Sequence, residues 1–219
     1  MTVTVITVAR TLGAGGEELG EAIADALGFR YVDAEIIDRA AALAGVEPGE
    51  VAKVEDRPGL VKRILAGLPG AGAKRTHAHG STDLAASGFE GLITEVIRET
   101  AAMEFVVIVA HGAAVPLAGT KGLLRVLVTA PAEVRALRLV GEDALTLEEA
   151  SRRIEESDAA RADFLKRFYG LERELPTHYD LIINTGELEL DEGLAAVLAV
   201  ARGEAPGARG SGFEAGSCA

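Results

Sequence analysis

The stretch that decides the fold runs from Val3 to Asp33 and reads VTVITVARTLGAGGEELGEAIADALGFRYVD. Its first seven residues, Val3 to Ala9, are a short β-branched run with the composition of a buried strand. After the glycines, apolar residues recur with helical spacing until Gly28, and Phe29 to Val32 then predicts a second strand. Strand, glycine turn, helix and strand form a βαβ unit. The backbone N–H groups at its turn and helix N-terminus make a natural anion site.

The glycine turn that follows the first strand fits three interpretations. In a dinucleotide fingerprint, Gly13 and Gly15 supply the first two glycines, but Glu18 stands in the place of the third. In a phosphate loop, Arg10, Gly15 and Gly16 stand in the places of the first glycine, the second glycine and the lysine. In the third interpretation the glycines serve only the close packing of helix on strand. The residues of the turn leave all three open.

Composition narrows the class of protein. The chain has 219 residues, of which 48% are hydrophobic and 26% charged, as expected for one globular domain with a buried core. The formal charge of −12 disfavours nucleic acid and anionic membrane surfaces as partners. The single cysteine, Cys218, excludes a disulfide framework and a cysteine-based zinc site. No run is long enough to span a membrane and no signal peptide is recognisable, so we expect a cytoplasmic protein.

Apolar runs alternate with helical patterns along the rest of the chain. Helical patterns begin near Asp33, Phe89 and Pro131; a capping box at Thr146 starts a long helix, and Asp191 is the expected cap of the last one. The alternation predicts an α/β protein with a doubly wound five-stranded parallel sheet and helices on both faces. The expected strands are Val3 to Ala9, Phe29 to Val32, Phe105 to Ala110, Leu123 to Thr129 and Tyr179 to Asn184.

We expect one domain over residues 1–202, followed by a disordered Gly- and Ala-rich tail over 203–219. Residues 69–88 are rich in Gly, Ala and Ser and predict a mobile insert. Its basic residues, Lys74 and Arg75, suit closure over an anionic ligand. Ligands in such sheets bind beyond the carboxyl ends of the strands. The rule places the glycine turn, Asp33 and His111 in one crevice.

The long helix from Thr146 carries an unusual group of charges. Its apolar stripe is interrupted around Asp158 and Arg161, and Lys166 and Arg167 follow. One interpretation is a solvated face with ion pairs between neighbouring turns. The other is a cluster of guanidinium groups for phosphate oxygens.

The order and spacing of these features resemble the cytidylate-kinase-like family, a branch of the P-loop nucleoside monophosphate kinases. Five segments within about residues 3–200 carry the resemblance, and only the tail lies outside them. They are ITVARTLGAGG, LGFRYVD ending at Asp33, Phe105 to Gly112, Ser157 to Arg161 continuing to Gly170, and YDLIINT ending at Thr185.

The resemblance implies a kinase of nucleoside monophosphates, with CMP or dCMP as acceptor, small-molecule nucleotides as partners, and ATP and Mg²⁺ as cofactors. It implies a P-loop kinase-like domain with a helical lid at about 151–172, and we assign no metal-binding residue from the sequence. By the same resemblance, the donor phosphates lie on Gly13, Ala14, Gly15, Gly16 and Glu17. Asp33 and Arg39 match the acceptor site, where we expect His111 to donate to phosphate as well. Asp158, Arg161 and Arg167 match the lid, and phosphoryl transfer needs positive charge, so we expect Arg10 to act as a catalytic residue with them.

The chain also departs from the family pattern, and its phosphate loop is degenerate. Glu17 and Glu18 stand where relatives usually have a basic or small residue, and His111 stands in the place of an arginine. A carboxylate beside a triphosphate repels it unless a metal ion bridges them. Two alternatives therefore stay open: a catalytically impaired member that binds nucleotide or a partner, and a dinucleotide-dependent enzyme.

Overall fold

The computed structural model describes residues 2–33, 35–44, 81–109, 112–143 and 145–203. Its core is a five-stranded sheet in which every pairing is parallel, as predicted. The strand order is β2-β3-β1-β4-β5, so β1 lies at the centre between β3 and β4. The bounds are β1 Val5–Arg10, β2 Arg30–Val32, β3 Val106–Val109, β4 Leu123–Thr129 and β5 Leu181–Asn184.

The strand order bears on the dinucleotide alternative. A dinucleotide-binding sheet has the order 3-2-1-4-5-6, in which the second strand lies beside the first. Here β3 lies between β1 and β2, with Val5 paired to Val106 and Tyr31 to Val107. The topology therefore disfavours the dinucleotide interpretation.

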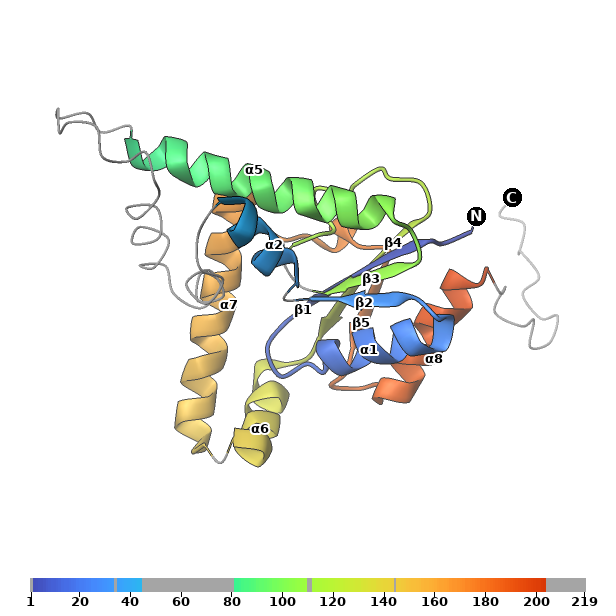
Figure 1. Ribbon diagram of the computed structural model, residues 1–219. Helices are drawn as coiled ribbons and strands as arrows, with labels where there is room; N and C mark the ends of the chain where they lie inside the picture. Colours follow the sequence, from blue (N-terminus) through green and yellow to red (C-terminus); the bar gives the residue numbers. More distant parts are fainter. Residues whose placement is uncertain (1, 34, 45–80, 110–111, 144, 204–219) are drawn as a thin grey trace, which may run out of the picture.

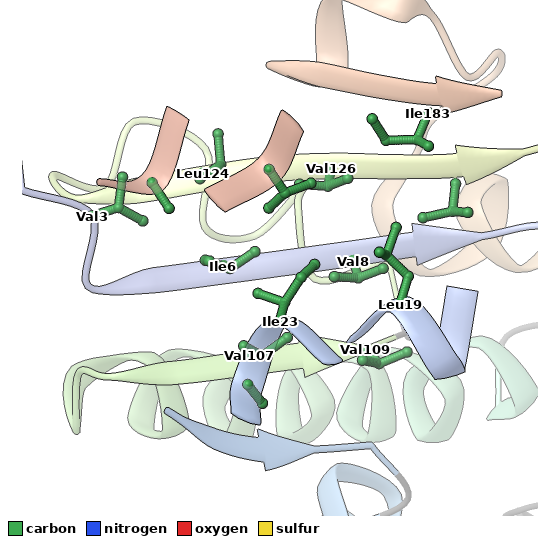
Figure 2. Packing of buried hydrophobic residues seen from close by; sticks show 14 of the residues in the cluster. Val3, Ile6, Val8, Leu19, Ile23, Val107, Val109, Leu124, Val126 and Ile183 are labelled. Carbon is green, nitrogen blue, oxygen red and sulfur yellow. The ribbon is translucent and has the colours of Figure 1, made fainter. Parts of the chain in front are cut away.

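Helices cover both faces of the sheet (Figure 1). One face packs against α1 (Gly16–Leu27) and α8 (Leu190–Ala201), and the other against α2 (Glu35–Ala44) and α5 (Ser81–Ala102). Figure 2 shows the first face, where Ile6 and Val8 of β1 meet Leu19 and Ile23 of α1. Ile23 is completely buried, and burial of such a side chain contributes about 1.5–3 kcal/mol. Successive side chains of the central strands point to opposite faces of the sheet, so the core consists of two apolar layers, one on each face.

Two further helices, α6 (Ala132–Asp143) and α7 (Leu147–Tyr169), form a pair beyond the carboxyl ends of the strands (Figure 1). The capping box predicted at the start of α7 is present: the Thr146 hydroxyl accepts from the Glu149 N–H, and the Glu149 carboxylate accepts from the Thr146 N–H. A short 3₁₀ turn, Pro176–His178, leads into β5. In the described part of the chain, no helix has the length and apolar character that crossing a membrane requires.

Four of the five strands begin one or two residues later than expected, and the starts of two helices also differ. Helix α5 begins at Ser81 rather than near Phe89, so residues 81–88 of the expected insert are helical; residues 69–80 and the tail beyond 203 lie outside the described residues. Polar residues suited to a helix start, and then alanines, outweigh the glycine in this stretch. The last helix is capped by Glu189 rather than Asp191, because the Glu192 carboxylate accepts from the Glu189 N–H.

Candidate phosphate-binding site

The glycine loop, residues 10–16, joins β1 to α1 at the carboxyl edge of the sheet. Gly13 and Gly15 have φ angles of 74° and 75°, a left-handed conformation that side chains disfavour. Gly16 is constrained differently, because a Cβ atom there would lie 2.4 Å from the Cβ of Arg10. No lysine fits at that position, so its absence follows from how the loop packs on β1.

Three successive carbonyl groups of the glycine loop are held from one side. The Leu12 oxygen accepts from Arg135 Nη1 at 3.3 Å, and the Gly13 oxygen accepts from Arg138 Nη1 at 3.2 Å. The Ala14 oxygen accepts from the Thr185 hydroxyl at 2.8 Å. Because a trans peptide directs its C=O and N–H to opposite sides, these bonds turn the N–H groups of the same peptides the other way. The Ala14 N–H donates to the Thr11 oxygen at 3.1 Å within the loop, so the loop donors left for an anion are the N–H groups of Gly13 and Gly15.

Arg135, on α6, is the side chain that connects this loop to α7. It is only 5% exposed, and its Nε donates to the Ala130 oxygen at 3.0 Å. Its two terminal nitrogens donate to the Asp158 carboxylate at 2.9 and 2.7 Å, a bidentate pair. Asp158, a predicted site residue, thus contacts the loop through Arg135 rather than directly.

Arg138 and Thr185 complete this support. The two terminal nitrogens of Arg138 donate to the hydroxyl and the backbone oxygen of Thr185, at 2.9 and 2.6 Å. Thr185 directly follows β5 and is 4% exposed. The end of β5, the first turns of α6 and the glycine loop therefore form one hydrogen-bonded unit.

The sequence interpretation missed Arg135, Arg138 and Thr185 as site residues. A signal was present, because Arg135 and Arg138 lie in the helix that starts after β4, and Thr185 follows the last strand. Both places are at the edge where ligands bind in parallel sheets. Their partners, however, are backbone carbonyls, and nothing in a side-chain pattern indicates which carbonyls need a donor.

A second group of charges lies on the other side of the loop. Arg10 Nε lies 2.5 Å from the Glu17 carboxylate, in the first turn of α1. Burial raises the pKa of Glu17, and the charges of Glu18 and Asp33 raise it further. The positive charge of Arg10 and the backbone N–H of Glu17 itself lower this pKa, but they do not outweigh the burial.

Burial and the same charged groups also shift the pKa of the Tyr31 hydroxyl. Burial raises its pKa to about 12, and the nearby charges of Asp33, Glu21 and Glu17 act in the same direction. The structure thus brings the predicted residues Arg10, Glu17 and Asp33 together beside the loop.

The other predicted arginines are paired with carboxylates instead. Arg39 on α2 donates to Glu99 on α5 at 3.0 Å, and Arg167 donates to Asp163 one turn earlier at 3.0 Å. Arg161 makes a bidentate pair with Glu174 at 3.1 and 2.6 Å. Within the described residues, none of the three donates to the glycine loop. His111 lies outside the described residues, so its predicted role stays a prediction.

The second half of α7 is packed against the body of the domain. Gly112, which follows β3, has a φ of 62°, and a Cβ there would lie 2.7 Å from the Tyr169 ring and 2.8 Å from Leu165. The Tyr179 hydroxyl donates to Glu174, the partner of Arg161. Burial and this hydrogen bond raise the pKa of Tyr179. This half of the helix therefore has a buried polar attachment as well as an apolar one.

The described residues offer few ligands for a divalent metal ion. No three His, Cys, Asp or Glu side chains gather into a metal site among the residues described here. Mg²⁺ in kinases, however, is held by one or two carboxylates together with phosphate oxygens. Glu17, at the mouth of the loop, is one such carboxylate. The donor set fits a metal ion that arrives with the nucleotide.

The comparisons with known proteins concern the family and the fold of this chain. Over 69 residues, 32% of this chain, the sequence is 35% identical to the cytidylate kinase of Methanopyrus kandleri, but the match spans 36% of that enzyme. A crystal structure of an uncharacterised protein from Eubacterium ventriosum matches 91% of this chain and 98% of its own, with a TM-score of 0.64 at 15% identity. The shikimate kinase of Bacteroides thetaiotaomicron matches the same shares with a TM-score of 0.51 at 18% identity.

These two structural likenesses concern the fold alone, which this chain shares with both proteins. The family model described as "Cytidylate kinase-like family" matches residues 5–187, which include the whole sheet, the glycine loop and α7. The chain therefore belongs to the cytidylate kinase-like family.

Proposed function

We propose that this protein transfers the terminal phosphoryl group of ATP to a nucleoside monophosphate, with CMP or dCMP as the acceptor. Family membership supports a kinase that transfers a phosphoryl group. The observation that carries the proposal is the anchoring of three successive loop carbonyls by Arg135, Arg138 and Thr185. Such a loop offers preorganised N–H donors, and phosphoryl transfer depends mainly on positioning and positive charge.

The N–H groups of the glycine loop and the first turn of α1 would bind the phosphates of the nucleotide donor. Mg²⁺ bound with those phosphates supplies charge neutralisation, and Glu17 is the side chain placed to contact it. Arg10 is the cation within the loop itself, and its side chain packs against Gly16. It takes the place of the absent lysine in balancing the phosphate charge.

We assign the acceptor phosphate to Arg39 and the migrating phosphoryl group to Arg161 and Arg167. Each guanidinium now binds a carboxylate, and a phosphate oxygen accepts from the same fork of donors. Exchange of carboxylate for phosphate requires α7 to act as a lid. His111 and Asp33 are the remaining candidates for contact with the acceptor.

The test is a coupled assay of ADP formation with Mg²⁺-ATP and CMP, dCMP, UMP or AMP. We expect turnover with CMP or dCMP, and a loss of about a thousandfold in Arg161→Ala, since a transition-state arginine is worth that much or more. Arg152→Ala is the matched control, because Arg152 is an arginine of the same helix with a 71% exposed side chain. Turnover equal to buffer on every acceptor contradicts the proposal.

The second candidate is a nucleotide-binding member of the fold without phosphoryl transfer. The pairing of Arg39 and Arg161 with glutamates favours it, since neither cation faces the loop in this conformation. Calorimetry distinguishes the two candidates: nucleotide binding without turnover on any acceptor supports the second one.

A further inference from the structure

We propose that Glu17 makes the glycine loop selective for a metal-complexed triphosphate over the metal-free one. The inference rests on the proposed function, because it concerns how the same loop receives its nucleotide. It starts from the Arg10–Glu17 ion pair, in which Arg10 Nε lies 2.5 Å from the carboxylate.

The pair brings a negative charge to the point where the loop should attract anions. Glu17 lies in the first turn of α1 and accepts from its own backbone N–H, one of the donors at the helix N-terminus. The same carboxylate neutralises Arg10, the cation packed against Gly16. A phosphate chain therefore meets a helix N-terminus and a guanidinium that are both already engaged with a carboxylate.

The neighbouring carboxylates add to the repulsion between Glu17 and a phosphate chain. Glu18 and Asp33 are close enough to Glu17 to act on it, and Glu21 joins them around Tyr31. Of the two arginines that donate to the loop carbonyls, Arg135 is paired with the Asp158 carboxylate, whereas Arg138 donates to the neutral Thr185 and keeps its positive charge. Among the described residues that act on Glu17 at the start of α1, the carboxylates of Glu18 and Asp33 accompany a single guanidinium, that of Arg10.

A divalent ion changes the effect of Glu17 on nucleotide binding from unfavourable to favourable. Bound to the phosphate oxygens, the ion is the largest local charge, and a carboxylate then attracts it rather than repelling the phosphates. Displacement of the Glu17 carboxylate toward the ion would also release Arg10 to donate to the phosphates. The same side chain thus penalises free triphosphate and favours its magnesium complex.

The experiment compares ATP binding by titration calorimetry in MgCl₂ and in EDTA, for the wild type, Glu17→Gln and Glu18→Gln. We expect Glu17→Gln to bind metal-free ATP about tenfold more tightly than the wild type, the effect of one contact to a charged group. The preference for the magnesium complex then falls by at least the same factor.

Glu18→Gln is the matched control, since it removes the same charge one residue away from a side chain that makes no ion pair with Arg10. We expect its magnesium preference to change less than that of Glu17→Gln, because the Glu18 side chain is exposed and its charge is screened. If both variants bind Mg²⁺-ATP with the wild-type preference, the inference is overturned while the proposed function stands. If no form of the protein binds ATP in either condition, both are overturned.

Discussion

The glycine loop and helix α7 both depend on arginines, but the partners of those arginines differ. Arg135 and Arg138 donate to loop carbonyls and hold the backbone in one conformation. Arg161 and Arg167, on α7, donate to carboxylates of Glu174 and Asp163. A carbonyl cannot be exchanged for a ligand without rebuilding the loop, whereas a carboxylate is readily replaced by a phosphate. This difference is the basis of our proposal that a fixed anion site lies beside a group of cations that exchange carboxylate for phosphate.

Among the substitutions that test this comparison, Arg135→Ala should lower the free energy of unfolding most. It leaves the Asp158 carboxylate without its bidentate partner and frees the Leu12 carbonyl. The Asp158 side chain is 40% exposed and can be solvated, so the loss should be that of hydrogen bonds to a charged group, about 1.5–3 kcal/mol, and urea unfolding measures the fall in free energy. Arg152→Ala, which removes an exposed arginine of α7 paired with Glu156 at 3.9 Å, should cost no more than about 0.5 kcal/mol. Equal losses in the two variants would show that Arg135 does not hold the loop.

Gly16→Ala tests how closely the loop packs on β1. The new Cβ would lie 2.4 Å from the Cβ of Arg10, and the resulting shift should cost about 1–3 kcal/mol. Gly141→Ala, in α6, is the control because nothing lies within 4 Å of its Cβ position. There the substitution should stabilise the protein by up to about 1 kcal/mol, the helix preference for alanine over glycine. Thermal unfolding with opposite shifts for the two variants is the expected result.

The attachment of α7 should weaken in acid, while the support of the loop by Thr185 should not. Burial would raise the pKa of Glu174, but the hydrogen bonds and charge of Arg161, with the Tyr179 hydroxyl, hold it below its ordinary value. The stability from this pair is therefore present above the ordinary glutamate pKa and is lost as the pH falls through the lowered one.

The destabilisation caused by Glu174→Gln should accordingly be largest at neutral pH and shrink as the pH falls below about 4. Thr185→Val removes a hydroxyl that donates to a carbonyl, so its cost should be the same at both ends of this range. Urea unfolding at a series of pH values measures both. A pH-independent Glu174→Gln effect would contradict the assignment of this ion pair.

Arg167→Ala should change stability least. Its ion pair with Asp163 lies within one helix, and both side chains are partly exposed, at 34% and 44%. Such a pair contributes about 0.2–0.5 kcal/mol, and urea unfolding should detect no larger loss. Phosphoryl transfer should nevertheless fall in the coupled assay, because the proposed role of this guanidinium is on the substrate. A loss of stability without a loss of rate would assign Arg167 to the structure of α7 alone.

Much of this fold could be predicted from local pattern. The sheet, its parallel pairing and the capping box at Thr146 depend on neighbouring residues, whose burial and hydrogen bonding repeat at short intervals. The error at Ser81 arose because a segment rich in small residues has no apolar stripe to mark it as helical. Family membership was also predicted, because the order of several weak motifs is more specific than any one of them.

The candidate site was only partly predictable. Arg10, Glu17 and Asp33 lie together beside the loop, because all three are within or next to the first βαβ unit. Arg39 and Arg161 pair with Glu99 and Glu174, which are 60 and 13 residues away along the chain. No periodicity relates such partners, so the interactions of these guanidinium groups in this conformation are a property of packing.

The sequence by itself determined the order of strands and helices along the chain, the glycine turn after the first strand and the family to which the chain belongs. Those features follow from side-chain periodicity and from backbone angles that only glycine adopts easily. The tertiary structure alone decided that Arg135, Arg138 and Thr185 hold three loop carbonyls, and that Gly16 leaves no room for a lysine. The physical reason is that backbone carbonyls are identical at every residue. Only the assembled fold decides which of them a buried donor reaches.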